Sequence, residues 1–262
     1  MRPVAEPTDG PRDGPIDGRG TVARALLAIA RDVPDDRALA GLICQACVAG
    51  LDIDGAGLSL FTASVASHIL HATDATAQLL EELQFTLNEG VCIEAATTGA
   101  PVFVDDLDDA GHAARWPAFA AAVREQTEAR AVFALPLRWG TVNLGVLDLY
   151  RRVPVGLSDE QRRDALAAAY TAASMMLTLR TEPTDRTDAG IRNGHNGSWL
   201  DPVVAGRAEV HQATGMVMAQ LNLPPADALA RMRGHAFATQ RLLIEVARDV
   251  VARRLDFTDE KM

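Results

Sequence analysis

The chain has 262 residues, of which 48% are hydrophobic and 23% charged, and its formal net charge is −10 at pH 7. This is the composition of an ordinary folded protein, so a disordered or fibrous chain is excluded, and no apolar run approaches the roughly 18 residues that span a bilayer. Three cysteines in a chain of this length exclude a disulfide-stapled scaffold and favour a reducing, cytoplasmic compartment.

The first elements predicted along the chain are two helices and a hairpin. Residues 1–20 are rich in Pro, Gly and Asp and lack the apolar segment of a signal peptide, so we expect a disordered lead. Apolar residues at helical spacing predict helices over 21–33 and from about 35 to 48. Alternating residues bounded by turn formers predict strands over 55–64 and 67–72.

The next stretch mixes short strands with helices. Short strands in hairpins between helices indicate an antiparallel sheet with helices packed on it, which is the α+β class. In chain order we expect helices at 74–85 and 90–98, a strand at 101–105, a helix at 116–126, strands at 131–139 and 142–150, and a helix from 158 to about 180.

A change of composition divides the chain in two. Residues 181–197 are mostly turn formers and are predicted to be a linker, and beyond them the pattern shows only helices, at 203–221, 225–238 and 240–255. Residues 198–262 hold eight acidic and eight basic side chains, so the net negative charge belongs to the first part. The expected domains are a lead (1–20), an N-terminal module (21–180), the linker, an all-helical module (198–256) and a tail (257–262).

Three short patterns could carry chemistry, and simpler explanations are favoured for each. Cys44 and Cys47 form a C-x-x-C that could be a redox pair or half a zinc site, but their apolar flanks favour buried structural cysteines. His68 and His71 lie three apart on a predicted strand, so they should face opposite sides and be solvated. The acidic run 105–109 is expected to be a solvated loop and not a cation site.

Several motifs of the N-terminal module resemble a GAF domain, with the resemblance covering about residues 20–180. They are Leu87-Asn-Glu-Gly-Val-Cys-Ile-Glu94, Thr98-Gly-Ala-Pro-Val-Phe-Val-Asp105, Arg115-Trp-Pro-Ala-Phe119, Ala134-Leu-Pro-Leu-Arg138 and Leu144-Gly-Val-Leu-Asp-Leu-Tyr150. The resemblance implies a sheet with a small-molecule or regulatory pocket on one face, although the fold names no ligand or cofactor. Apolar and aromatic residues on segments that should converge there are also explained by plain core packing. The candidate pocket residues are Leu60, Cys92, Phe103, Trp116, Phe119, Phe133 and Leu147.

An enzymatic alternative rests on the segment around Cys92. Gly90-Val-Cys92 faintly resembles a motif of GAF-type methionine sulfoxide reductases. Those enzymes need further cysteines downstream, and this sequence has none after Cys92, so the usual redox cycle lacks its resolving thiol. We therefore expect no catalytic residue and no metal ligand.

Three segments of the C-terminal module resemble an ANTAR domain, in the correct order and with family-like spacing. They are Arg207-Ala-Glu-Val-His-Gln-Ala-Thr-Gly-Met-Val-Met218, Pro225-Ala-Asp-Ala-Leu-Ala-Arg-Met-Arg-Gly-His-Ala236 and Arg241-Leu-Leu-Ile-Glu-Val-Ala-Arg-Asp-Val-Val251. The resemblance implies binding to paired RNA hairpins with small loops and control of transcription termination or of a start site. Arginine suits both phosphate and base contacts. The residues that would bind RNA are Arg207, His211, Thr214, Arg231, Arg233, Arg241 and Arg248.

Elementary patterns of the C-terminal module stand beside that resemblance. Apolar residues predict buried stripes that make a small three-helix bundle. A close helix–helix approach would explain Gly215 in mid-helix, and the preceding Thr214 replaces a basic residue that the family often has, which weakens the phosphate contact expected there. From the pattern alone, Arg241 and Arg248 could equally be surface residues paired with acids such as Glu245.

These observations together predict a cytoplasmic, signal-responsive RNA-binding regulator with no membrane association. Helices 158–180 and 203–221 carry more apolar surface than one sheet or bundle contact requires, so we expect a homodimer. A DNA-binding regulator is the first alternative, but acids accompany the arginines of the third helix, which suits a major groove poorly. The GAF-type redox enzyme is the second.

Overall fold

The structure is a computed structural model that describes residues 20–29, 33–61, 67–181 and 201–258. Side chains at several ends of these ranges, including 179–181 and 201–207, are outside the description. The predicted lead (1–20) and linker (181–197) also fall outside it, apart from Gly20 and Thr181.

Five strands form one antiparallel sheet in the order β2-β1-β5-β4-β3, which confirms the predicted class of the N-terminal module. The strands are β1 (Gly55–Phe61), β2 (Ser67–Ala72), β3 (Val102–Val104), β4 (Ala131–Trp139) and β5 (Val142–Arg151). Because side chains alternate across a strand, Phe133 and Leu135 enter one core while Val132 and Ala134 enter another. The sheet is therefore buried on both faces.

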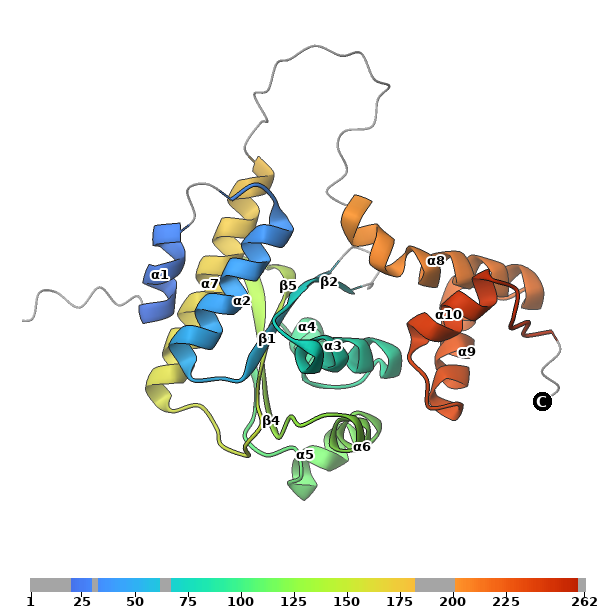
Figure 1. Cartoon of the computed structure of the whole chain (residues 1–262), viewed down its shortest axis with the longest axis horizontal. Coiled ribbons are helices and arrows are strands. Elements are labelled where there is room, and N and C mark those ends of the chain that lie inside the picture. The colour runs from blue at the N-terminus through green and yellow to red at the C-terminus, as the bar shows by residue number, and fades with distance from the viewer. Residues whose placement is uncertain (1–19, 30–32, 62–66, 182–200, 259–262) are drawn as a thin grey trace, which may run out of the picture.

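Helices cover both faces of this sheet (Figure 1). One core packs under α1 (Thr21–Ile29), α2 (Asp36–Leu51) and α7 (Asp159–Thr181). The other packs under α3 (Ala75–Leu87), α4 (Val91–Thr98) and α6 (Pro117–Gln126).

Short polar signals set where these helices begin and end. Asp35 caps α2 and Asp74 caps α3, each accepting a hydrogen bond of 2.8 Å from a backbone N–H three residues on. α4 ends at Gly99, which has a φ of 66°. The acidic run 105–109 is a polar turn, as expected, but its Asp109 also caps the short helix α5 (Ala110–Arg115), which the sequence analysis missed.

The C-terminal module is the predicted bundle of three helices. They are α8 (Asp201–Leu221), α9 (Pro225–Ala238) and α10 (Leu243–Val251). α10 is shorter than the predicted 240–255, because Gln240 and Arg253 adopt left-handed backbone conformations on either side of it. Phe257, which was assigned to the tail, is 1% exposed in the core of the bundle, so the predicted boundary after residue 256 is wrong.

Two interpretations of apolar and glycine positions are corrected. The stripe of α8 that suggested a dimer contact, with Val210, Ala213 and Val217, is buried inside the bundle, and most of the small residues of α7 are buried in the sheet core. A Cβ added at Gly215 would meet no atom of the described chain within 4 Å, so no helix–helix approach within the chain requires this glycine.

The two modules touch at two places: α3 contacts α9 and α10, and β2 contacts α8. In Figure 1, α3 lies between the sheet and the bundle. Phe85 of α3 is 6% exposed and belongs to the core of the helical bundle. The buried backbone N–H of Leu243 donates to the hydroxyl oxygen of Thr86 at 3.1 Å, so a first-turn amide of α10 is satisfied by the other module. Among helices in the described ranges, none combines the length and apolarity that crossing a bilayer requires.

Candidate functional site

The seven candidate pocket residues do not share one face of the sheet. Leu60, Phe103, Phe133 and Leu147 pack in the core beneath α2 and α7. Cys92, Trp116 and Phe119 pack in the opposite core, beneath α3, α4 and α6. The expectation that all seven converge is therefore wrong, because the four strand residues share one face of the sheet while the other three belong to α4 and the start of α6, which cover the opposite face.

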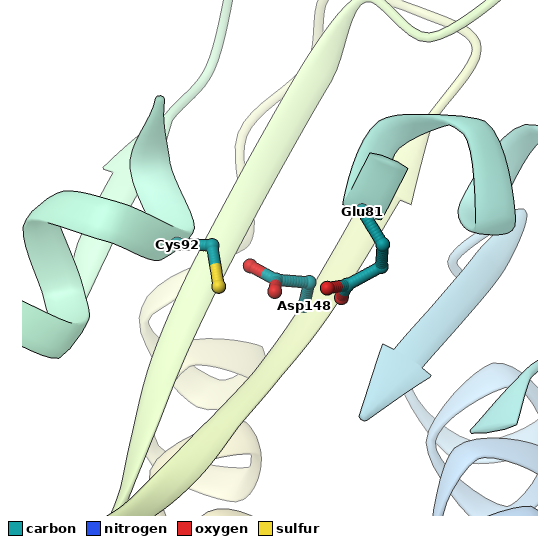
Figure 2. Close-up of side chains that lie close together, drawn as sticks. All are labelled: Glu81, Cys92 and Asp148. Atoms are coloured by element: carbon teal, nitrogen blue, oxygen red, sulfur yellow. The ribbon is translucent and has the colours of Figure 1, made fainter. Parts of the chain in front are cut away.

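The second core contains a cluster of groups that could ligate a metal. Glu81 from α3, Cys92 from α4 and Asp148 from β5 place one carboxylate oxygen each and a sulfur within 4.8 Å of one another. Figure 2 shows the carboxyl group of Asp148 lying between the thiol and the Glu81 carboxyl group. Glu81 and Cys92 are each 2% exposed and Asp148 is 8% exposed.

Each group of this cluster is held in place by a neighbour. The hydroxyl group of Ser59 donates to Glu81 Oε2 at 2.5 Å. The backbone N–H of Cys92 donates to Gln84 Oε1 at 2.7 Å. Gly57 leaves space beside the cluster, since a Cβ there would lie 2.8 Å from Glu81 Oε1 and would displace that carboxyl group.

Burial disfavours charge in this cluster. The pKa of Asp148 is raised well above its usual value, first by desolvation and then by the negative charge of Glu81. Neither Asp148 oxygen has a hydrogen-bond partner of normal geometry in the described chain. Two buried carboxyl groups this close cannot both stay ionised on their own. The pair therefore either shares a proton or binds a cation.

The cavity beside the cluster is small. It has a volume of about 10 Å³ and is lined partly by Gly57, Gln84, Asp148 and Tyr150. That volume holds about one water molecule, whereas a pocket for an organic ligand takes about 300 Å³ or more. This cavity, as the described residues line it, therefore has no room for a small molecule of ordinary size.

Cys44, Cys47 and His68 are all buried, which was predicted for the two cysteines but not for the histidine. Cys44 and Cys47 are fully buried, as predicted, and burial raises the pKa of Cys47 to about 12. Both lie in the core beneath α2 and α7, whereas Cys92 lies in the opposite one. The prediction of a solvated His68 is wrong, because it is 4% exposed and its ring centroid lies 6.4 Å from that of His211 on α8.

The residues expected to bind RNA are spread over the bundle. Arg248 donates to Glu209 at 2.9 Å, and Arg241 donates to Asp249 at 2.7 Å, so neither pairs with Glu245. Glu245 instead accepts from the backbone N–H of Leu242 at the start of α10.

Thr214 and Arg207 give less support to the predicted RNA-binding surface. The Thr214 hydroxyl donates to the carbonyl oxygen of Val210 at 2.7 Å, so its proton is committed within α8. The side chain of Arg207 lies outside the described residues, and Arg231 is half-buried on α9.

Arg233 lies at the contact between the modules. Its guanidinium carbon is 5.5 Å from the ring centroid of Phe85, and its Nε is buried with no hydrogen-bond partner among the residues that the structure describes. Desolvation lowers the pKa of Arg233, so the contact is costly for this cation. Beside it, a groove of about 940 Å³ runs between α3, α6, α9 and the start of α10.

The fold and these contacts define a two-module protein, an α+β domain carrying a small helical bundle. The chain belongs to the GAF domain family, whose model matches residues 33–177, and the ANTAR domain model matches residues 203–251. GAF domains are sensors and ANTAR domains are RNA-binding regulator domains, so the chain combines a sensor with a regulator. A comparison with curated proteins found no match.

Solved structures support the fold of the sensor module. The GAF domain of a phosphoenolpyruvate-protein phosphotransferase from Coxiella burnetii is 13% identical, with a TM-score of 0.50 over 61% of this chain and 92% of that one. The GAF domain of an Acinetobacter phosphoenolpyruvate-protein phosphotransferase is 10% identical, with a TM-score of 0.50 over 63% and 96%. At this identity the likeness shows the fold alone.

The sequence analysis missed Glu81 and Asp148 as members of a site. Asp148 is a lone charge in the apolar strand Leu144-Gly-Val-Leu-Asp-Leu-Tyr150, and that signal could have marked it. Their meeting with Cys92 could not be read from spacing, because the three residues lie on three elements.

Proposed function

We propose that this protein is a signal-responsive regulator that binds paired RNA hairpins through its ANTAR domain and acts by transcription antitermination or related hairpin control. The observation that carries the proposal is the match of residues 203–251 to the ANTAR family on a folded bundle that keeps Arg241 and Arg248 at its surface. The Arg241 and Arg248 side chains are 36% and 58% exposed.

The ion pairs of these arginines do not oppose RNA binding. Exposed ion pairs contribute only about 0–1 kcal/mol. A backbone phosphate of RNA carries one negative charge, as a carboxylate does, and accepts the same two-pronged contact from arginine, so exchanging Asp249 or Glu209 for phosphate costs little. Gly215, with open space around it, lets a nucleic-acid backbone approach α8 closely.

The contact between modules supports control by the sensor. With Arg233 packed against Phe85, one expected RNA contact is covered while the bundle rests on α3. Release of the bundle would give that guanidinium to RNA and also remove its desolvation. We infer that the docked arrangement is the low-affinity form.

The test is RNA binding by the full chain at several salt concentrations. Arg248→Ala and Arg241→Ala should each weaken binding to a two-hairpin RNA and reduce the slope of log affinity against log salt by about 0.7–0.9. Arg152→Ala, on an exposed arginine of the sensor, is the matched control and should change neither quantity. Equal affinity for duplex DNA of arbitrary sequence would contradict the proposal and favour the DNA-binding alternative.

The redox-enzyme alternative has little support. Both remaining thiols of the chain lie in the core opposite Cys92, with the sheet between, and burial raises the pKa of each. A protonated thiol in another core does not resolve an intermediate on Cys92.

A further inference from the structure

We propose that Glu81, Cys92 and Asp148 form a binding site for one divalent transition-metal ion of the zinc type in the sensor domain. The site itself is independent of RNA binding. That the ion is the signal of this regulator rests on the proposed function.

The donor atoms suit such an ion. A thiolate and two carboxylates form a mixed sulfur–oxygen set that favours zinc, cobalt or ferrous iron over magnesium or calcium. Ligand atoms around a tetrahedral zinc ion stand about 3.5 Å apart, given bond lengths of about 2.0–2.3 Å. The three ligand atoms lie within 4.8 Å of one another. Small side-chain rotations would bring them to the spacing around a zinc ion.

The surroundings are those of a built site. Ser59 holds the Glu81 carboxyl group and Gln84 holds the Cys92 backbone, which is the arrangement of an outer shell that orients ligands. Gly90, with a φ of 124°, is required there as well, because a Cβ would lie 2.8 Å from Gln84 Oε1.

Size and charge decide the kind of ligand. The adjoining cavity of about 10 Å³ accepts one water molecule as a fourth ligand, and no organic molecule fits. Asp148 is more than nine-tenths buried, and its oxygens face the cluster without a hydrogen-bond partner of normal geometry among the described residues. A dication would offset two of the three negative charges of the thiolate and the two carboxylates, and both the thiol and the carboxyl pair would release their protons to solvent on binding.

The position of the site links it to the bundle. Glu81 lies four residues before Phe85 on α3, so an ion that draws Glu81 toward β5 acts on the helix that holds the bundle. Control by the ion would then pass through α3 without involving the linker.

The experiment is titration of the metal-free full chain with Co²⁺ as the probe. We expect a near-ultraviolet thiolate-to-cobalt band that saturates at one equivalent and disappears when Zn²⁺ is added. Cys92→Ser should abolish the band, and the near-isosteric Asp148→Asn should weaken binding by more than about tenfold, the loss that even outer-shell changes cause.

Two controls keep the result interpretable. The double variant Cys44→Ala/Cys47→Ala should keep the band, and a band that is lost in it but survives Cys92→Ser overturns the site. Zn²⁺ at about a hundredfold excess over its dissociation constant should raise the Tm of the unaltered chain by about 5–10 °C. No band and no shift in Tm would mean a proton-sharing carboxyl pair and would overturn the proposal.

The same preparation separates this proposal from the proposed function. Metal binding without any affinity for two-hairpin RNA would leave the site standing and contradict the RNA-binding role. RNA binding without a cobalt band would do the reverse. RNA affinity that is unchanged by saturating Zn²⁺ would show that the ion is not the signal.

Discussion

Asp249 is the residue that organises the charged face of the bundle. It accepts hydrogen bonds from Arg241 and Arg254, each at 2.7 Å. The sequence pattern predicted paired arginines but named Glu245, because helical spacing alone ranks neighbours three or four residues apart. Arg241 lies eight residues before Asp249 and Arg254 lies five residues after it. The turn after α10 brings Arg254 back to Asp249.

The loss of folding stability at acid pH should depend on Asp249. The hydrogen bonds from Arg241 and then Arg254 hold its pKa below the usual value, so the folded state favours the charged form. This contribution is present at neutral pH and is lost as the pH falls below about 4 toward the lowered pKa. Asp249→Asn should lower the Tm at pH 7, and the difference from the unaltered chain should shrink at pH 3. A constant difference across that range would contradict this assignment.

At the scale of elements, sequence periodicity predicted most helices and strands but not their arrangement. Caps such as Asp35, Asp74 and Gly99 are local signals, so the starts of α2 and α3 and the end of α4 followed from the sequence. α5 was missed because it is six residues long and buries none of them, leaving no periodic apolar signal. The sheet order and the two faces depend on long-range pairing, which no local pattern encodes.

α3 is the element on which the docking of the bundle depends. Phe85→Ala removes a side chain that is 6% exposed at the contact, and Thr86→Val removes the acceptor for the Leu243 amide. Losing about 1.4 kcal/mol of docking free energy would raise apparent RNA affinity by about tenfold if the docked form predominates. We expect Phe85→Ala to reach that range and Thr86→Val to show a smaller gain, measured by fluorescence anisotropy.

The control for this prediction is Val153→Ala, a change at a 53%-exposed position on the sensor, which should leave affinity unchanged. Near-ultraviolet circular dichroism checks that the bundle core survives the loss of Phe85. Weaker RNA binding by a folded Thr86→Val variant would show that the docked form is the competent one.

At the scale of the whole molecule, the homodimer expected from the sequence stays a prediction, and it now rests on the exposed part of α7 alone. Most residues first assigned to the interface are buried within the chain. Leu166 and Tyr170 of α7 are instead 42% and 63% exposed, and Tyr170 stacks on Trp139, which is 44% exposed. These three side chains form an apolar patch of the kind that marks protein interfaces.

Charge placed in that patch should therefore separate the subunits. Tyr170→Glu is expected to shift the mass in light scattering from twice the 27.9 kDa chain toward that of a single chain. Val153→Glu, at another exposed apolar position, should leave the mass unchanged. If the unaltered chain already runs as a monomer at micromolar concentration, the dimer prediction is wrong.

The hydrogen bond from the Leu243 amide to Thr86 has a consequence for chimeric proteins. An engineer who grafts a foreign sensor onto this bundle, cutting in the linker, would leave the first turn of α10 without its acceptor and the bundle core without Phe85. The graft would expose apolar surface and lose solubility, however well each part folds. A transplantable unit therefore has to carry residues 85 and 86 of α3 along with the bundle.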